Sequence, residues 1–213
     1  MLVDHWPLLG LRVRTERLEL RLPTGEELAD LADLAAAGVH APDQRPFLTP
    51  WTDRAPAARA REVVQSHWRR RGTWSPEDWS LDLVVYQAGR PIGVQEIGAR
   101  DFAVLREVRT TSWLGLAHHG RGIGGEMRSA VLHLAFEGLD ASEATTASFT
   151  DNPAPLGVSR RLGYQPDGIS RDVLDGRAVV SQRLRLTRAQ WEETPRPEVT
   201  LSGLEPCRWQ FGA

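Results

Sequence analysis

The sequence predicts one α/β (α+β) domain, with a central, twisted, mixed β-sheet and helices on both of its faces. Candidate strands and helices follow one another as β-α-α-β-β-β-α-β-α-β-β, and the strand–helix–strand unit in the middle is typical of a crossover between parallel strands. The 213 residues are 41% hydrophobic and 25% charged, which is the composition of a globular protein. No change of composition marks a linker, so we expect a single domain over 1–213, with a core at about 12–190 and a tail at 194–213.

The first part of the chain predicts one strand and two helices. Leucines alternate with charged residues over 16–22, which is the period of a half-buried strand. Thr24 can then cap a helix over 25–39, because Glu27 stands at the capping-box spacing and apolar residues recur on one face. That face consists of Leu28, Leu31, Ala32 and Ala35. A second helix is expected over about 56–71, after a loop rich in proline.

The rest of the chain begins with the clearest hairpin, at 79–99, where apolar residues alternate on both sides of the turn "AGRP". A strand near 107–116, a long helix near 121–137 and a strand over "SEATTASF" follow. "PAPLGVSRRLG" predicts a short helix that ends at Gly163. "YQPDGI" and "AVVSQRLRL" have strand character, and "TRAQWEE" predicts a last helical turn.

Basic residues and cysteine exclude several kinds of chemistry. All 26 basic residues are arginine, so a lysine Schiff base and a P-loop are both excluded. Cys207 is the only cysteine, which excludes an intrachain disulfide and a multi-cysteine zinc site. The net charge of −2 gives no overall attraction to nucleic acid, so we expect the arginines of "RRRG", at 69–72, to lie at the solvated end of a helix.

The stretch "GLAHHGRGIGGE", residues 115–126, joins an expected strand to the long helix. Each glycine weakens a helix start by about 1 kcal/mol relative to alanine, so an open backbone must serve a purpose here. The free N–H groups of a helix start and the helix dipole favour an anion, and Arg121 adds a positive charge. The stretch is therefore typical of a pyrophosphate-binding turn. The glycines at 120–125 have the spacing G-x-G-x-x-G, but the turn comes after several elements and not at the first β-α unit, which disfavours a dinucleotide-binding Rossmann fold.

The segment 119–124 resembles the Q/R-x-x-G-x-G/A signature of the GNAT acyltransferases, with histidine at the first position. "SWLGL" before it is similar to the bulged fourth strand of that family, and "AVLHLAF" after it to the third helix. "DNPAPLGVSRRLGYQPDG" resembles the family segment N-x-x-S-x-x-V-x-x-x-L-G-F/Y. The resemblance covers about 12–190 and is to the RimJ/RimL-like subgroup, in particular to an actinobacterial branch with proposed succinyl-CoA-dependent members.

This resemblance implies a GNAT fold, in which the bulged fourth strand is splayed from the fifth. It also implies that the acyl donor is acetyl-CoA or succinyl-CoA and that no metal takes part. The main chain of the bulged strand would hold the pantetheine arm, Asn152 would hold it from the other side, and the glycine turn would bind the pyrophosphate. The implied CoA-binding residues are Trp113, Leu114, Leu116, His119, Gly120, Arg121, Gly122, Ile123, Gly124, Gly125 and Asn152.

Acyl transfer from a thioester to an amine needs a proton acceptor, donors for the tetrahedral oxyanion and a way for the thiolate to leave. Many relatives carry a glutamate where this chain reads "VRTTSW", so Glu96 on the preceding strand is the candidate base, acting through water. Pro155 stands where relatives have a serine, and proline cannot donate a hydrogen bond. Ser148 or Tyr164 can replace it as an acid, and the alternative for Tyr164 is packing beside Gly163. The candidate catalytic residues are Glu96, Ser112, Asn152 and Tyr164.

In this family the acceptor site is built by the loop between the first two helices and by the late hairpin. That loop is 39–53 here, and its polar residues could also bind the carboxylate of a succinyl group. Loop solvation is the alternative for the polar residues, and core packing is the alternative for the tryptophans. The candidate substrate-binding residues are His40, Arg45, Trp51 and Trp79.

The expected activity is transfer of an acetyl or succinyl group from CoA to an amine of a small molecule or protein, directly through a ternary complex. The alternative is a catalytically weak acyl-CoA-binding regulatory protein, which the missing strand glutamate and Pro155 favour. A homodimer is expected from the family resemblance and the many tryptophans. No run of apolar residues is long enough for a membrane span, so we expect no membrane partner and a cytoplasmic location. The net charge of −2 leads us to expect no nucleic-acid partner.

Overall fold

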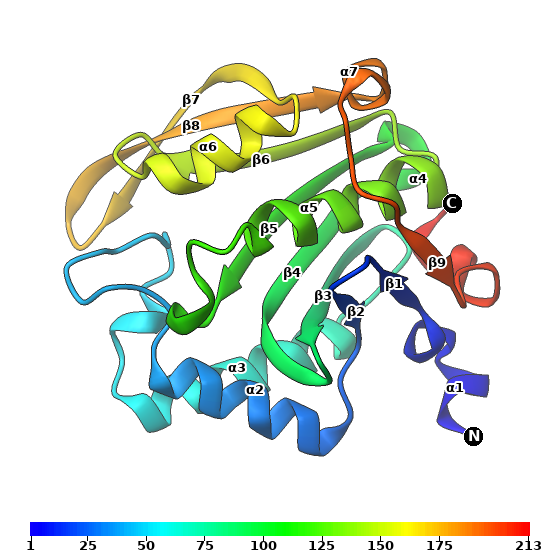
Figure 1. Cartoon of the computed structure of the whole chain (residues 1–213), viewed down its shortest axis with the longest axis horizontal. Helices are drawn as coiled ribbons and strands as arrows, with labels where there is room; N and C mark the ends of the chain where they lie inside the picture. Colours follow the sequence, from blue (N-terminus) through cyan, green and yellow to red (C-terminus); the bar gives the residue numbers. More distant parts are fainter.

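Nine strands form one mixed sheet with helices on both faces in the computed structural model, which describes residues 1–213 (Figure 1). The strands are β1 (Arg12–Arg14), β2 (Glu19–Arg21), β3 (Asp78–Gln87), β4 (Arg90–Arg100), β5 (Glu107–Leu114), β6 (Glu143–Phe149), β7 (Gln165–Leu174), β8 (Arg177–Thr187) and β9 (Thr200–Ser202). They lie in the order β7-β8-β6-β5-β4-β3-β2-β1-β9. The predicted fold class is therefore confirmed.

Seven α-helices accompany the sheet. They are α1 (Leu2–His5), α2 (Gly25–Ala37), α3 (Pro56–Gly72), α4 (Phe102–Leu105), α5 (Ile123–His133), α6 (Pro153–Arg161) and α7 (Arg188–Glu193). A π-helical turn over Leu134–Gly138 extends α5, and short 3-10 turns lie at Pro7–Gly10, Trp51–Asp53, Leu116–His118 and Glu205–Phe211. Helices α2 and α3 cover one face of the sheet, and α5 and α6 cover the other (Figure 1). None of the helices combines the length and the apolar character that a membrane span requires.

Helix α2 begins where its capping residues predict. The main-chain N–H of Glu27 donates to Thr24 Oγ1 at 3.3 Å, and the N–H of Thr24 donates to the Glu27 carboxylate at 2.8 Å. This reciprocal pair satisfies two N–H groups that a helix start otherwise leaves free. The four apolar residues expected on one face of this helix are all buried.

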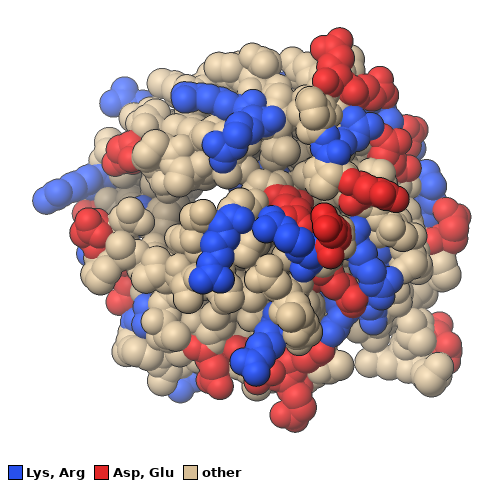
Figure 2. Space-filling model, in the orientation of Figure 1, with Lys and Arg blue, Asp and Glu red and all other residues tan.

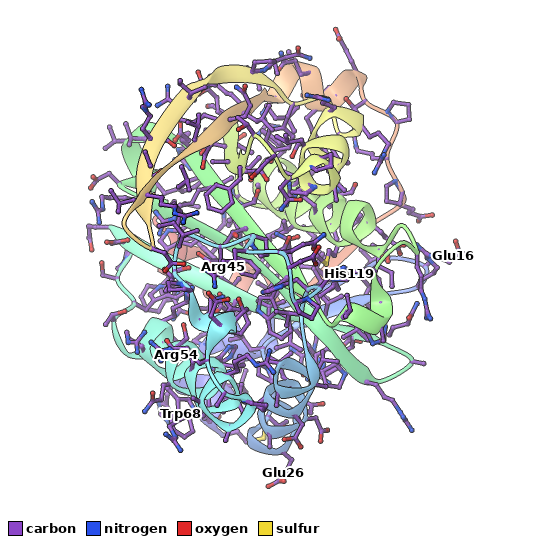
Figure 3. All side chains as sticks on the ribbon, turned by 90° about the vertical axis from the view of Figure 1, so that its left-hand side faces the viewer. Glu16, Glu26, Arg45, Arg54, Trp68 and His119 are labelled. Atoms are coloured by element: carbon purple, nitrogen blue, oxygen red, sulfur yellow. The ribbon has the colours of Figure 1, made fainter.

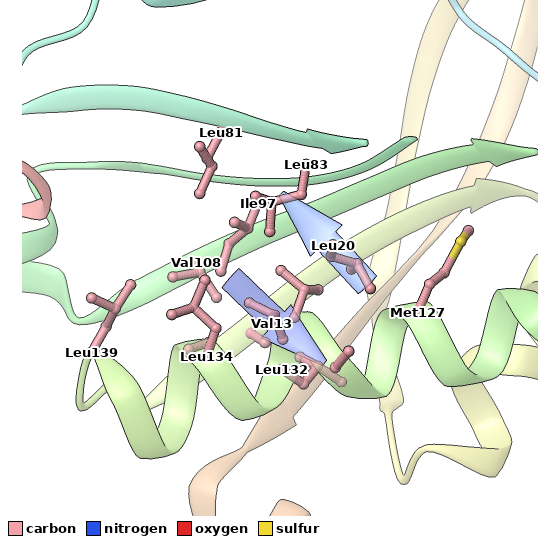
Figure 4. Close-up of a cluster of buried hydrophobic side chains, with 14 of the residues drawn as sticks. Val13, Leu20, Leu81, Leu83, Ile97, Val108, Met127, Leu132, Leu134 and Leu139 are labelled. Atoms are coloured by element: carbon pink, nitrogen blue, oxygen red, sulfur yellow. The ribbon is translucent and has the colours of Figure 1, made fainter. Parts of the chain in front are cut away.

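Alternation along β3 divides the interior into two cores, one on each side of the sheet. Leu81, Leu83 and Val85 belong to the larger core, under α5. Val84 and Tyr86 belong to the smaller core, under α2 and α3. Figure 4 shows the larger core, where side chains of α5 and its continuation pack on β3, β4 and β5.

Strands β5 and β6 are the only parallel neighbours, and α5 is the crossover between them, as expected. They pair only where Glu107–Arg109 faces Glu143–Thr145, and then they diverge. The expected splay is therefore present, but the expected bulge is not, because β5 keeps an unbroken register with β4 up to Leu114. Gly93 allows this close approach, because a Cβ there would lie 2.3 Å from the carbonyl oxygen of Trp113. Because the two strands diverge, the edge of β5 that faces β6 has no strand partner along the last residues of β5.

The two ends of the chain contain structure that the sequence analysis did not predict. β1 pairs with β2 on one side and with β9 on the other, so the segment at 194–213 completes the sheet. Its Cys207 and Phe211 are fully buried in the larger core. The strand expected over 16–22 is the shorter β2, and the residues before it form β1.

Candidate functional site

The glycine turn begins α5 with an open backbone. Gly122 is the N-cap residue, with a φ of 77° in the left-handed region, and no side chain caps the helix. A Cβ added at Gly120, Gly124 or Gly125 would meet no other atom within 4 Å. The turn therefore has open space beside its glycines, and the helix dipole makes this space favourable for an anion.

Two side chains outside the signature's glycines shape this turn. His119 Nε2 lies 3.1 Å from the carbonyl oxygen of Leu114, which ties the turn to the end of β5. Arg17 Nη2 would lie 3.9 Å from a Cβ on Gly122, and Arg17 Nε donates to Glu126 at 2.7 Å. Arg17 thus adds a cation beside the turn, while Arg121 is exposed. Arg17 is distant in the chain and belongs to no motif, so no pattern in the sequence indicates its place beside the turn.

A cavity of about 480 Å³ lies on the α2–α3 side and reaches the gap between β5 and β6. Of the predicted site residues, Trp51, Glu96, Ser112 and Trp113 line it. The Trp51 and Trp113 rings form one wall, with 5.7 Å between their centroids. In Figure 2 the surface is hollowed between α6 and the start of α5, and basic side chains lie on both sides of the hollow. The cavity and the glycine turn thus approach the same gap from opposite faces of the sheet.

Two carboxylates and one arginine lie together in this cavity. Arg70 donates to Asp82 Oδ2 at 2.7 Å and to Glu96 Oε2 at 3.0 Å, and Ser80 donates to Glu96 Oε1 at 2.7 Å. Asp82 Oδ1 is buried without a partner. Burial raises the pKa of Asp82 to about 7, against the effect of Arg70, and the nearby Glu96 raises it further. The pair can therefore hold or release a proton near neutral pH.

His67 lies beside this pair and is neutral. Burial, followed by the charges of Arg71 and Arg70, lowers the pKa of its imidazole to about 3. Its ring therefore adds no positive charge to the cavity. Across the whole structure, no group of three or more His, Cys, Asp or Glu side chains is arranged to hold a metal ion.

The arginines of "RRRG" do not all lie in solvent, which corrects the expectation for 69–72. Arg70 bridges the two carboxylates, and Arg71 Nη2 donates to the carbonyl oxygen of Pro23 at 3.2 Å. The last turn of α3 packs against β3, so these side chains enter the interior, where polar atoms receive them. The charge run in the sequence gave no sign of the acidic partners, which lie on other elements.

Trp79 does not line the cavity, which corrects the prediction of a substrate-binding role. It is 1% exposed, stacks on Trp74 at 5.7 Å and meets Phe211 edge-on at 4.9 Å. Its indole N–H donates to the carbonyl oxygen of Phe211 at 3.1 Å. Alternation along β3 explains this placement, because Trp79 shares the larger core with Leu81 while Asp82 faces the cavity.

Tyr164 and Asn152 lie on the α6 side of the gap. Tyr164 is 2% exposed and does not line the cavity; its hydroxyl lies 3.5 Å from Thr110 Oγ1, and burial raises its pKa. Tyr164 therefore packs in the interior, which is the alternative to its predicted role as an acid. Asn152 is the N-cap residue of α6, but its side chain does not cap the helix. Its N–H donates to the carbonyl oxygen of Phe149 at 3.0 Å, and Phe149 lines the cavity.

His40 and Arg45 lie on the acceptor loop but outside the cavity wall. The ring nitrogens of His40 contact the Ala41 carbonyl oxygen at 2.8 Å and Thr52 Oγ1 at 2.7 Å. Arg45 forms ion pairs with Asp53, at 3.3 Å, and with Asp175 in the turn between β7 and β8. Arg45 and His119 lie toward the same side of the molecule (Figure 3). The Arg45–Asp175 pair thus joins the loop to the late hairpin.

Comparisons with known proteins agree with this architecture. The family described as acetyltransferase (GNAT) domain matches residues 17–165. RimL, a ribosomal L7/L12 alpha-N-protein acetyltransferase in complex with coenzyme A, has a TM-score of 0.65 and 18% identity, over 81% of this chain and 95% of that chain. RimJ of Mycobacterium smegmatis, in complex with CoA-disulfide, has a TM-score of 0.64 and 16% identity, over 87% of this chain and 88% of that chain.

A chimera of the spermidine N-acetyltransferase SpeG from Vibrio cholerae and hSSAT has a TM-score of 0.64 and 15% identity, over 84% of this chain and 99% of that chain. At such identities, the structural similarities show a shared fold only. The family match is the stronger finding, because it spans well over half of the sequence and includes the crossover and the glycine turn. This chain therefore belongs to the GNAT acetyltransferase family.

Proposed function

We propose that the chain is an acyl-CoA N-acyltransferase that moves an acetyl group from acetyl-CoA to an amine, directly through a ternary complex. The observation that carries the proposal is that the open glycine turn and the acidic cavity meet at the gap between β5 and β6. The CoA pyrophosphate would bind at 119–125, and the pantetheine arm would follow the main chain of Trp113 and Leu114, with Asn152 opposite. The predicted contact with Leu116 is left out, because its N–H donates to the carbonyl oxygen of Gly38 at 3.0 Å and its carbonyl oxygen accepts from the N–H of His119 at 3.2 Å. The thioester would then reach the cavity at Ser112.

The cavity supplies a proton acceptor for this reaction. Glu96, directly or through water, takes a proton from the ammonium group and becomes neutral, while the Asp82 carboxylate keeps its hydrogen bond from Arg70. The amine nitrogen attacks the thioester carbonyl carbon, and the main-chain N–H of Leu114 stabilises the oxyanion. The oxyanion then re-forms the C=O bond as the C–S bond breaks, the electron pair of that bond stays on the sulfur, and the nitrogen gives its second proton to water.

The acceptor is an amine of a protein or a small molecule. RimL and SpeG are named for a protein α-amine and for spermidine, and both acceptors are amines. The cavity is lined by the carboxylates of Glu62, Asp82 and Glu96 and by two arginines, and these carboxylates suit the protonated form of such a group. The homodimer and the cytoplasmic location stay predictions.

Contacts of the acceptor loop favour acetyl over succinyl as the donor group. A succinyl carboxylate needs a cation or several donors when it leaves water. Arg45 is already paired with two aspartates, and both ring nitrogens of His40 are engaged. Neither side chain offers a free partner at the cavity, so succinyl-CoA is the second candidate donor.

Release of free thiol, measured with a panel of amines, tests this function. Wild-type protein is expected to turn over acetyl-CoA with at least one amine, at a kcat/KM about tenfold or more above that for succinyl-CoA. A preference for succinyl-CoA would overturn the choice of donor. Tight CoA binding by calorimetry without turnover of any amine would favour the acyl-CoA-binding regulatory protein, which Pro155 supports.

The raised pKa of Asp82 predicts a pH dependence that Asp82→Asn removes. In the wild type, kcat/KM is expected to rise with pH through about 7, because the carboxylate pair must lose its proton before it can accept another. Asp82→Asn removes the group that titrates near this pH, so the rise through about 7 should disappear from the profile. Profiles between about pH 5 and 9 check this, and coincident profiles for the two proteins would contradict it.

The same substitution should change stability with a definite sign. The pKa of Asp82 is higher in the folded chain than in the unfolded one, so its favourable contribution is present below the unfolded value and lost as pH rises through about 7. Asp82→Asn should therefore gain thermal stability relative to the wild type above pH 7, which thermal unfolding at acidic and alkaline pH measures. Equal changes at both pH values would contradict the assignment.

A further inference from the structure

Arg128 is a buried cation that faces only neutral partners. It extends from α5 and is 5% exposed. Its Nη1 donates to Ser159 Oγ at 2.9 Å, its Nη2 donates to Ser112 Oγ at 3.4 Å, and its Nε has no partner. The arginine of the acceptor cavity differs, because Arg70 is held between two carboxylates.

Such an arrangement is costly for the fold. A guanidinium stays charged in proteins, and a buried charge without a counter-ion is strongly destabilising. Burial lowers the pKa of Arg128, and the buried phenol of Tyr164 is the acidic group that opposes this effect. An apolar side chain of the same length would fill this place without the cost, so the positive charge must serve a purpose other than stability.

The contacts of the two serines show where the charge can act. Ser159 donates its own hydroxyl to the carbonyl oxygen of Pro155 at 3.0 Å, so its proton is engaged within α6. Ser112 receives a hydrogen bond from Arg128 and lines the cavity at the gap between β5 and β6. A hydroxyl that accepts from a cation becomes a stronger donor, so Ser112 can present a polarised proton to a group in the gap.

We propose that Arg128 is a positioning residue that acts through Ser112 to stabilise the sulfur of the departing CoA thiolate. The inference rests on the acyl transfer proposed above. When the tetrahedral intermediate collapses, the C–S bond breaks and its electron pair moves to sulfur, while the Ser112 hydroxyl keeps its proton and donates a hydrogen bond to that sulfur. The thiolate leaves as an anion and takes a proton from water, so no acid is needed at Pro155.

The test compares Arg128→Met, Ser112→Ala and the double variant with the wild type, using Arg160→Met on the exposed side of α6 as the control. Arg128→Met should lower kcat by about 10-fold to 100-fold with little change in the KM for acetyl-CoA, and the double variant should be no worse than the single ones. The melting temperature of Arg128→Met should equal or exceed that of the wild type, because this variant lacks the uncompensated charge of the arginine. A structural role would instead lower both stability and affinity.

A second readout does not depend on turnover. Ultraviolet titration of bound CoA should show its thiol ionising at lower pH in the wild type than in Arg128→Met or Ser112→Ala, and Arg160→Met should behave as the wild type does. The other ionisable groups around this site are Tyr164 on one side and the Glu96–Asp82 pair on the other, and these variants leave them in place.

Each outcome decides between the two proposals. A lower thiol pKa in the wild type only, together with the loss of kcat, supports the role of Arg128. The same thiol pKa and kcat in wild type and variants would overturn that role and leave acyl transfer intact. Failure of the wild type to bind CoA at all would overturn acyl transfer, and the role of Arg128 with it.

Discussion

Replacing Glu96 with glutamine is expected to lower kcat by about 100-fold or more and to leave the KM for acetyl-CoA within about twofold. Glutamine has the shape of glutamate, and its amide oxygen can still accept a hydrogen bond from Arg70 or Ser80. The fold and the cavity should therefore survive. What is lost is a group that can take a proton from the ammonium group of the acceptor, and an amine that keeps its proton has no lone pair for attack.

Thiol-release kinetics with saturating amine measure this effect, and Glu26→Gln on the exposed first turn of α2 is the matched control. Above the pKa of the free amine, the variant should recover part of its activity, because water then supplies the unprotonated form. An unchanged kcat in a folded Glu96→Gln protein would mean that the base is elsewhere. Asp82 would then be the next carboxylate to change.

Replacing Gly122 with valine is expected to weaken CoA binding tenfold or more, which is about 1.4 kcal/mol. Gly122 has a φ of 77°, and a β-branched residue is strongly disfavoured in that region. A valine side chain would also occupy space beside the first N–H groups of α5, where the pyrophosphate is proposed to lie. Its nearest neighbour would be Arg17, with Nη2 at 3.9 Å from the added Cβ.

Gly89→Val separates backbone strain from loss of the anion site. Gly89 has a φ of 76° in the turn between β3 and β4, and a Cβ there would meet no atom within 4 Å. It should therefore lose stability like Gly122→Val but bind CoA as the wild type does, by calorimetry. Equal affinity for CoA in all three folded proteins would refute the proposed position of the pyrophosphate.

Much of the fold could be predicted because its signals are local. The capping pair at Thr24, the alternation along β3 and β4, and the glycines before α5 each act within a few residues, and each lies where the sequence places it. β1 and β9 have three residues each, which is too short for a period to be recognised. Their pairing joins the two ends of the chain, and no local pattern carries that information.

The candidate site also has one part that a local sequence pattern predicts and one part that it does not. The glycine turn is contiguous, so a motif could indicate it. The acidic cavity is assembled from α3, β3 and β4, and Arg70 and Asp82 carry no motif of their own. Alternation along β3 places Trp79 and Asp82 on opposite faces, but it does not indicate which face is hollow, because that depends on how α3 packs. Arg128 was hidden for a related reason, because its position on a helix beside apolar residues gives no indication that it lacks a counter-ion.

The gap between β5 and β6 gives the sheet a further property. On the proposed arrangement, the nucleotide and the amine approach from opposite faces and share only the opening between two strands. Residues that select the amine lie on the loop at 39–53, on α3 and on the late hairpin, whereas those that hold the nucleotide lie on the turn before α5. The amine site and the nucleotide site can therefore change independently. Mutations that alter the entrance for the amine leave the nucleotide site unchanged. A sheet with a single gap between two strands thus allows one fold to accept different amines while it keeps the same acyl donor.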